Sequence, residues 1–389
     1  MPKVKLKDVV MRVKEKVDKD DTDLEYYVGG EHIDGNEICV SRRGVIQGST
    51  IGPAFHMAFK AGDVLLMSRN PHLRKASMVD FDGICSDVSY ICRTKDENVL
   101  LQSFLPFLMQ TNDFWRFAEE NKKGGLPFFL NWSDFERYEF ELPPIDKQRE
   151  LSQLLWAMQR TKQAYQTLLT KSDELVKSQF IELFGSPIKN PNAWPTLSIG
   201  DATEDILSGQ CLNGAAGILQ PGQKAVLKVS AVTYGDFKAD EYKVLYDPKQ
   251  ITKGIYPQNG DLLFSRANTK EYVGATALID RDYPDLMLPD KLWKLVFKPI
   301  ILPIFAKYFL SHPEVRAVLS EMATGTSGSM FNISMEKLKD LKIIVPDMNT
   351  QLRFIEFAQQ LDKSKFELRQ GIANINNLMN SLMQQDFSN

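Results

Sequence analysis

The chain has 389 residues, of which 43% are hydrophobic, and its net charge of −3 comes from 47 basic and 50 acidic side chains. This length accommodates two or three domains, each with its own core, and the composition excludes a disordered chain. The N-terminal segment is charged and lacks the apolar run of a secretory signal, and no run of 18 apolar residues occurs, so we expect a cytoplasmic protein without a membrane span. The negative net charge argues against a simple nucleic-acid-binding protein, which is usually basic.

Metal and nucleophile chemistry find no support in the sequence. The four cysteines form no CxxC pair, and the four histidines are scattered without ligand spacing. A zinc site or a disulfide framework is therefore not expected, which fits a reducing compartment. No Ser-His-Asp arrangement and no pair of carboxylates stands out, so the sequence does not indicate a hydrolase.

The two halves of the chain repeat the same order of segments. Phe59–Arg69 resembles Tyr256–Arg266, and Lys122–Leu151 resembles Ala323–Phe354, at a nearly constant offset. In each half, short runs rich in branched and aromatic residues predict strands, and a helical piece, a glycine-rich loop and a proline-terminated extended segment follow. The pattern indicates a tandem duplication of an α+β unit, with a period too long for a solenoid.

Five segments follow from this pattern, and prolines mark the start of each long helix. In chain order we expect a globular domain over residues 1–143, a long helix over 144–184, a hinge over 185–195, a second globular domain over 196–345 and a second long helix over 346–389.

Both long helices carry an apolar seam with the alternating three- and four-residue spacing of a coiled coil. The first seam comprises Leu151, Leu154, Met158, Tyr165, Leu168 and Leu175, with Thr161, Ser172 and Gln179 as polar members. The second comprises Phe354, Ala358, Leu361, Leu368, Ile372, Ile375, Met379 and Leu382, with Lys365 as its polar member. A helix of this length cannot bury such a stripe alone, so we expect the two to pair. Two surface helices on unrelated domains are the alternative.

The segment "LFGSPIKNPNAWP" joins the first long helix to the second globular unit. Asn190-Pro191 followed by Trp194 is similar to the Asn-Pro-Pro-aromatic loop with which amino-methylating DNA methyltransferases hold a flipped base. Asn192 replaces the second proline, and the glycine-rich loops of this chain follow helices rather than an early strand. Gly185 suits the end of a helix. A turn between two domains is therefore favoured over a catalytic loop.

The order of these segments resembles the DNA-specificity subunit of Type I restriction–modification enzymes over nearly the whole chain. The resemblance is carried by the duplicated strands "GDVLLMSR" and "GDLLFSR", the helix entry "PPIDKQREL", the junction "KSQFIELFGSPIKNPNAWP" and the second unit "NIS…LKDLKIIVP…TQLRFIEF". It implies an α+β fold in which two globular target-recognition domains alternate with two long helices that pack as an antiparallel coiled coil.

The resemblance also implies a non-catalytic subunit that binds no cofactor of its own. Its partners would be double-stranded DNA, two methylation subunits that transfer a methyl group from S-adenosylmethionine to adenine, and restriction subunits that translocate DNA with ATP. The methylation subunits would carry much of the phosphate neutralisation, which resolves the negative charge of this chain. We expect an asymmetric target with two half-sites about one helical turn, ~10 base pairs, apart. The alternatives are a methyltransferase and a coiled-coil adaptor that binds no DNA.

Candidate DNA-contacting residues follow from side-chain chemistry, because Arg can bridge two guanine acceptors and Asn can pair with adenine. After the first duplicated strand these are Arg69, Asn70, His72, Arg74 and Lys75, and after the second they are Arg266, Asn268, Lys270 and Tyr272. The arginines that end the two strands are expected at matching positions. Arg42, Arg43 and Lys123 are candidates for phosphate, as are the loops around Gly125 and Gly328. The alternative for each is a solvated turn.

Overall fold

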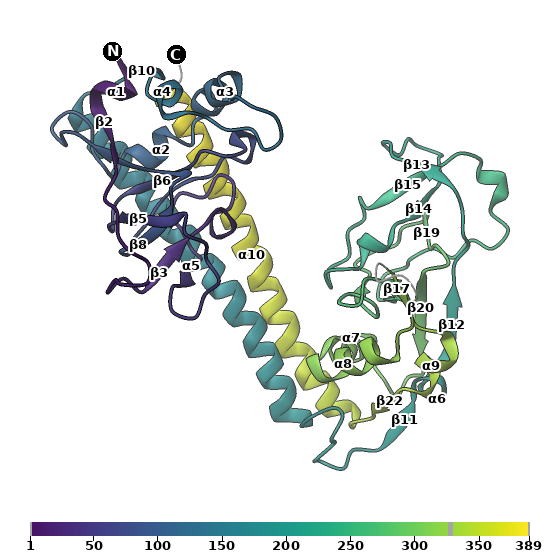
Figure 1. Ribbon diagram of the computed structural model, residues 1–389. Coiled ribbons are helices and arrows are strands. Elements are labelled where there is room, and N and C mark those ends of the chain that lie inside the picture. Colours follow the sequence, from purple (N-terminus) through teal and green to yellow (C-terminus); the bar gives the residue numbers. More distant parts are fainter. Residues whose placement is uncertain (1, 326–329, 388–389) are drawn as a thin grey trace. The chain divides into compact units, whose positions relative to one another are not determined.

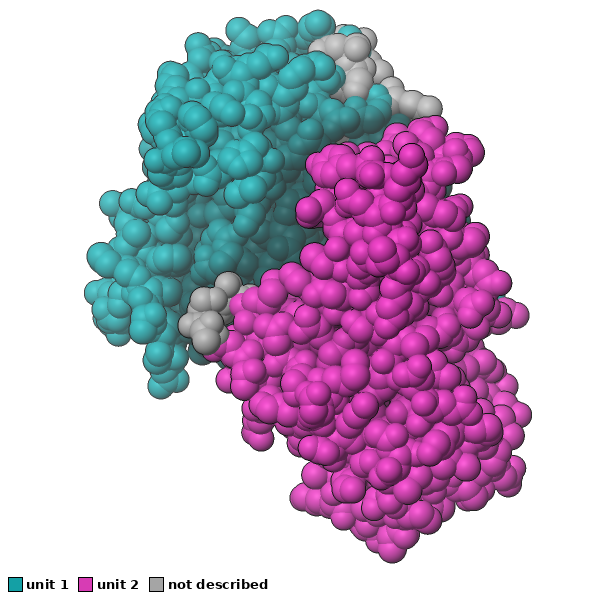
Figure 2. Space-filling view, turned by 90° about the vertical axis from the view of Figure 1, so that its right-hand side faces the viewer, with its two compact units in different colours: residues 1–168, 367–389 teal, residues 169–366 magenta. Residues whose placement is uncertain are grey.

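The computed structural model describes residues 2–325 and 330–387 and combines helices with small sheets. It divides into two compact units, residues 1–168 with 367–389 and residues 169–366, which Figure 2 shows in teal and magenta. Two 40-residue helices, α5 (Ile145–Phe184) and α10 (Met348–Phe387), contribute to both units (Figure 1).

Unit 1 contains two four-stranded sheets, in the orders β2-β9-β6-β7 and β4-β3-β8-β5, and the pair β1-β10. Its elements are β1 (Lys3–Lys5), α1 (Leu6–Val9), β2 (Val10–Val13), β3 (Tyr26–Val28), η1 (Gly30–His32), β4 (Gly44–Val45), β5 (Phe55–Phe59), β6 (Val64–Met67), η2 (Pro71–Leu73), β7 (Ala76–Met78), β8 (Gly83–Ser86), β9 (Ser89–Thr94), α2 (Leu105–Leu108), α3 (Asn112–Glu120), α4 (Trp132–Phe135) and β10 (Glu139–Glu141).

Unit 2 has sheets in the orders β12-β20-β16-β18 and β13-β15-β14-β19, with the pairs β11-β22 and β17-β21. Its elements are β11 (Thr196–Ser198), α6 (Ile199–Ala202), β12 (Thr203–Ser208), β13 (Gly214–Ala215), β14 (Ala225–Leu227), η3 (Val229–Ala231), β15 (Tyr242–Leu245), η4 (Pro248–Gln250), β16 (Leu262–Ser265), β17 (Ala267–Asn268), β18 (Thr276–Leu278), β19 (Leu286–Met287), β20 (Leu292–Phe297), α7 (Pro303–Ser311), α8 (Pro313–Met322), β21 (Phe331–Asn332), α9 (Met335–Asp340) and β22 (Lys342–Ile344).

The sheets β2-β9-β6-β7 and β12-β20-β16-β18 and the pairs β1-β10 and β11-β22 are connected alike in the two units, which confirms the predicted duplication, whereas the second four-stranded sheets differ in strand order. The turns that open β6 and β16 are built alike: Gly62 and Gly260 have φ of +94° and +83°, a conformation that favours glycine. The next residue in each copy is an aspartate in an ion pair, Asp63 with Arg93 at 2.8 Å and Asp261 with Lys294 at 2.7 Å. The pairs therefore tie the start of each strand to its neighbour in the sheet.

Each long helix is fastened to its domain by a fully buried glutamine in its first turns. Gln148 Nε2 donates to the carbonyls of Val99 and Pro143, and its Oε1 accepts from the N–H of Leu101 at 3.0 Å. Gln351 repeats these contacts in unit 2 with Ile300, Pro346 and Leu302. Both amide protons and one lone pair of the amide oxygen are thus used, at the same place in both copies.

The two long helices pair in an antiparallel arrangement, as expected. In unit 1 the glycine at position 371 of α10 faces Tyr165 of α5, whose ring a Cβ would approach to 2.6 Å. In unit 2 Lys365 Nζ lies 3.0 Å from Asp173 Oδ1, and the rings of Phe180 and Phe354 meet at 5.4 Å. Residues with rising numbers along α5 therefore contact residues with falling numbers along α10, as in an antiparallel pair.

The seam of α5 differs from the prediction at one of its two heptad positions. Leu154, Leu168 and Leu175 are 44–49% exposed, whereas Leu155 and Val176 are buried. Each misplaced leucine is the first of two adjacent apolar residues, so the spacing alone permits two seams, one residue apart. The remaining predicted members Leu151, Met158 and Tyr165, and in α10 Phe354, Leu361, Leu368, Ile372, Ile375, Met379 and Leu382, are buried or half-buried.

The segment after α5 forms a closed turn. Gly185 ends the helix with φ of +74°, and its N–H donates to Ile181 O. The side-chain amide of Asn190 both accepts from the N–H of Trp194 and donates to its carbonyl, at 2.9 and 2.8 Å. Trp194 Nε1 donates to Phe184 O at 3.2 Å. The amide that a catalytic loop would offer to a base is used within the turn.

The adjacent leucines of α5 provide a direct test of the corrected seam. Leu155→Ala removes a fully buried side chain and should lower the free energy of unfolding of unit 1 by about 2–5 kcal/mol. Leu154→Ala, the matched control, should change it by no more than about 0.5 kcal/mol. Denaturant unfolding of both variants measures the difference. Equal losses would restore the original seam.

The glutamine at the start of α10 provides a second test. Gln351→Ala leaves the N–H of Leu302 without its side-chain acceptor, and should destabilise unit 2 by about 1–3 kcal/mol. Gln359→Ala, at an exposed position of the same helix, is the control. We expect faster amide hydrogen exchange at Leu302 in the first variant alone, and an unchanged rate there would contradict the assigned role.

Candidate nucleic-acid interface

In unit 1 the chain brings two of the predicted DNA-contacting loops together. Arg69 forms an antiparallel bridge with Phe129, and the N–H of Asn70 donates to Phe128 O at 2.7 Å. Lys123 and Phe129 exchange backbone hydrogen bonds of 2.8 and 3.0 Å, which closes a hairpin over residues 123–129. The turn after β6 and this hairpin therefore form one surface of unit 1.

The predicted residues of the turn divide into free and engaged side chains. Arg69 and His72 are exposed, and neither has a side-chain partner among the residues that the structure describes. Arg74 Nη1 donates to Asn112 Oδ1 at 2.9 Å, and Lys75 Nζ donates to the Gly30 carbonyl. Arg74 and Lys75 therefore hold neighbouring segments in place, which leaves Arg69 and His72 available to a ligand.

Asn70 combines a left-handed backbone conformation with an unpaired side-chain oxygen. Its φ of 53° is left-handed, which asparagine tolerates better than most residues. Its side-chain Oδ1 is buried and has no hydrogen-bond partner in the described structure. An unpaired buried acceptor is costly, so it marks a place where a donor is missing.

The three candidates for phosphate are also engaged within unit 1. Arg42 forms an ion pair with Asp34, and the guanidinium of Arg43 stacks over the ring of Tyr26 at 3.8 Å. Lys123 Nζ lies 2.8 Å from Asp134 Oδ2, and this hydrogen bond is the main reason why the pKa of Asp134 is lowered. Half of the Lys123 side chain is nevertheless exposed at the base of the hairpin.

The predicted match between the arginines that end β6 and β16 is wrong by one residue. Met67 and Ser265 occupy the same place, because their N–H groups donate to equivalent carbonyls, of Lys75 and Ala275. Arg69 therefore corresponds to Ala267, and Arg266 to the serine at 68. The error arises because "GDVLLMSR" is one residue longer than "GDLLFSR", so aligning the arginines shifts the register.

The residues that do match are Asn70 and Asn268, each three residues after the end of its strand. Arg266 is tied to Asp290, with Nε donating to its carbonyl at 2.9 Å and Nη2 to Oδ2 at 3.0 Å. Asn268 Nδ2 donates to Thr233 Oγ1 at 3.0 Å. Asn268 thus lies in a polar surface that can offer hydrogen bonds, whereas Arg266 supports the fold around it.

The sequence analysis missed the segment that contributes Thr233. Tyr234 follows it, is 65% exposed, and meets the ring of Tyr272 edge-on at 5.4 Å. Lys238 Nζ lies 5.0 Å from the Tyr234 ring centroid, and the predicted Lys270 is exposed nearby in the chain after Asn268. The only sequence signal was an aromatic and a basic residue within a polar stretch.

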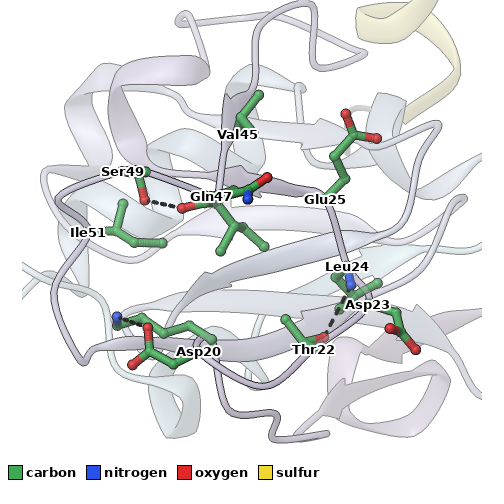
Figure 3. Close-up of a pocket in the computed structure, with 12 residues that line it drawn as sticks. Asp20, Thr22, Asp23, Leu24, Glu25, Val45, Gln47, Ser49 and Ile51 are labelled. Carbon is green, nitrogen blue, oxygen red and sulfur yellow. Dashed lines mark hydrogen bonds and ion pairs between the residues drawn. The ribbon is translucent and has the colours of Figure 1, made fainter.

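Two pockets differ sharply in charge. The one in Figure 3, about 630 Å³, lies in unit 1 between residues 19–25 and 45–51 and is lined by Asp20, Asp23 and Glu25, which disfavour phosphate. A pocket of about 350 Å³ in unit 2 is lined by Lys228, Lys243 and Lys291, beside the Asp290 that binds Arg266. The cationic pocket therefore adjoins the surface around Asn268.

Within residues 2–325 and 330–387, no cluster of side chains is suited to hold a metal ion. No helix in the same ranges is both long and apolar enough to cross a bilayer. The predicted loop residue Gly328 lies outside the described residues.

Residues 191–377 match the family model of the Type I restriction modification DNA specificity domain. Over 168 residues the chain is 27% identical to the Type I restriction enzyme EcoKI specificity subunit of Escherichia coli strain K12, covering 42% of this chain and 36% of that protein. The EcoEI specificity subunit of Escherichia coli is 30% identical over 151 residues, 37% of this chain and 25% of that one. The matched parts therefore span about a third or less of these relatives.

Similarity in fold extends over the whole chain. The S subunit of a Type I restriction–modification system from M. genitalium superposes with a TM-score of 0.60 at 12% identity, covering all of this chain and 96% of that chain. A chain from a type I R-M system gives 0.54 at 18% identity, covering 99% and 96%. Fold, duplication and family model together define a DNA-specificity domain protein. Residues 191–377 carry the Type I restriction modification DNA specificity domain, and the similarity of the whole chain to the solved structures is one of fold.

The different surroundings of the two arginines predict different effects on stability. Arg69→Ala removes a side chain without partners and should change the unfolding of unit 1 by no more than about 0.5 kcal/mol. Arg266→Ala removes both hydrogen bonds to Asp290 and should destabilise unit 2 by about 1 kcal/mol. Thermal unfolding monitors both variants, and a larger loss for Arg69→Ala would contradict the assignment.

Proposed function

We propose that the chain is the sequence-specificity subunit of a Type I restriction–modification complex and binds double-stranded DNA through both units. The observation that carries the proposal is the repeated construction of the surfaces: an asparagine lies three residues after the end of β6 and of β16, and the segment before it pairs with the chain after a glycine-rich loop. Asparagine can form two hydrogen bonds with adenine, and arginine two with guanine, so both surfaces carry chemistry suited to base edges.

The two units would recognise different half-sites. Unit 1 presents Arg69 and His72 beside its hairpin, while unit 2 presents Asn268 with Tyr272 and a cationic pocket. Because these side chains differ, the expected target is asymmetric, with base pairs between the half-sites that neither unit contacts. A spacing on the order of one helical turn, ~10 base pairs, follows from two-domain recognition of one duplex.

Partner subunits would supply the chemistry and much of the phosphate binding. The net charge of −3 leaves this chain without the excess of cations that nonspecific DNA binding requires. Two methylation subunits with S-adenosylmethionine would modify adenine, and restriction subunits with ATP would translocate and cut DNA. This chain would position them, with no catalytic residue or cofactor of its own.

Adenine-methylation mapping tests the proposal. We expect a gapped, asymmetric motif in the genome of cells that carry the gene, and its disappearance when the gene is deleted, because the methylation subunits then lose their target specificity. A methylation pattern that does not change on deletion, in cells where the methylation subunits are present and active, would overturn the proposal and favour an adaptor.

Arg69→Ala sharpens the same experiment. Loss of one bidentate base contact should weaken binding to the intact motif by about 1–3 kcal/mol and relax the sequence in one half-site only. Arg149→Ala, which removes an exposed arginine from α5, is the control. If both half-sites relax equally, Arg69 contacts the backbone rather than a base.

A further inference from the structure

The tip of the unit 1 hairpin exposes an apolar side chain almost completely. Leu126 is 87% exposed, more than any other large apolar side chain in the described part of the chain. Full burial of a leucine is worth about 1.5–3 kcal/mol, and this side chain gains almost none of that within the chain. A single exposed leucine is ordinary, so its support and its neighbours must carry the argument.

The hairpin holds this leucine in a fixed position. Its base is closed by both backbone hydrogen bonds between Lys123 and Phe129, and the Phe129 ring covers Gly124, where a Cβ would approach a ring carbon to 2.7 Å. Phe128 accepts from the backbone of Asn70, and its ring lies 4.7 Å from Lys122 Nζ. The tip is therefore ordered in advance, so little entropy remains to be lost on binding.

Cationic and polar groups surround the base of the hairpin. Arg69 pairs through its backbone with Phe129, and its guanidinium is free of partners in the described structure. Lys122 and Lys123 flank the tip, each with one carboxylate partner, Glu119 at 2.6 Å and Asp134 at 2.8 Å. An apolar tip with cations at its base is the arrangement by which leucine, phenylalanine or methionine enters between base pairs while cations bind the adjacent phosphates.

We propose that Leu126 acts as a wedge that inserts between two base pairs of the duplex and partly unstacks one step at the half-site bound by unit 1. The inference rests on the proposed function and adds to it a specificity determinant that makes no hydrogen bond. Pyrimidine–purine steps unstack most easily, so the wedge would favour such a step at one position that no polar side chain reads.

The test uses the chain in complex with its methylation subunits, bound to a duplex that carries the mapped motif. 2-Aminopurine replaces one base at a time across both half-sites, and its fluorescence rises where stacking is lost. We expect a rise at one step that does not contain the methylated adenine. Leu126→Ala should abolish that rise and weaken binding about tenfold, the value of one lost apolar contact of this size.

Three comparisons make the outcome decisive. Leu126→Met should retain the signal because methionine is also an effective wedge. Val99→Ala, at an exposed apolar position on the loop that anchors α5, should leave both signal and affinity unchanged. The signal at the methylated adenine should persist in every variant, which shows that the complex is intact.

The two proposals fail separately. If the complex binds its motif but no step outside the methylated adenine brightens, the wedge is wrong and the proposed function stands. If Leu126→Ala releases the methylation subunits without altering DNA stacking, the tip contacts protein and the wedge is again wrong. If the unmodified complex shows no preference for the motif, the proposed function itself fails, and the wedge with it.

Discussion

The buried glutamine at the start of each long helix is the contact on which the rest of each unit depends. A helix begins with N–H groups that lack intrahelical partners, and the chain that leads into it must also satisfy its own polar groups. Gln148 and Gln351 solve the second problem, since each amide binds one carbonyl and one N–H from a loop about 50 residues earlier and a second carbonyl from the chain that enters the helix. The helix is therefore fixed to the domain that precedes it, not merely connected to it.

In unit 1, a series of contacts connects this glutamine to the turn that carries Arg69. The loop held by Gln148 leads directly into α2 and α3, and α3 receives the turn after β6 through Arg74 and Asn112. That turn pairs with the hairpin that ends at Phe129, so a chain of backbone and amide contacts links the helix start to Arg69. The second unit repeats the glutamine anchor with Gln351 and the pairing after the strand with β17 and β21, whereas its second sheet has a different strand order. Recognition can thus diverge while the support is retained.

The sequence was sufficient for the large features because they depend on periodicity and repetition. The α+β fold, the two long helices and the duplication all follow from patterns that extend over many residues. The sequence failed where a difference of one residue decides. Leu154 and Leu155 are both apolar, and only the packing of α5 in the folded unit shows that Leu155 is the buried one. Arg69 and Arg266 were misaligned because the two similar segments differ in length by one residue. Thr233 and Tyr234 were missed because only tertiary structure brings them to Asn268.

Ion pairs within each unit leave few free cations on the two candidate surfaces. Three of the candidate cations are neutralised within their own unit, Arg42 by Asp34, Lys123 by Asp134 and Arg266 by Asp290. Exposed ion pairs of this kind add little stability, but they remove the free positive charge that attracts any stretch of DNA. What remains is a small number of unpaired groups, with Arg69 foremost. Under the proposed function, such a subunit would bind weakly to DNA in general, and its preference for one sequence would depend on those few contacts and on partners that supply the missing charge.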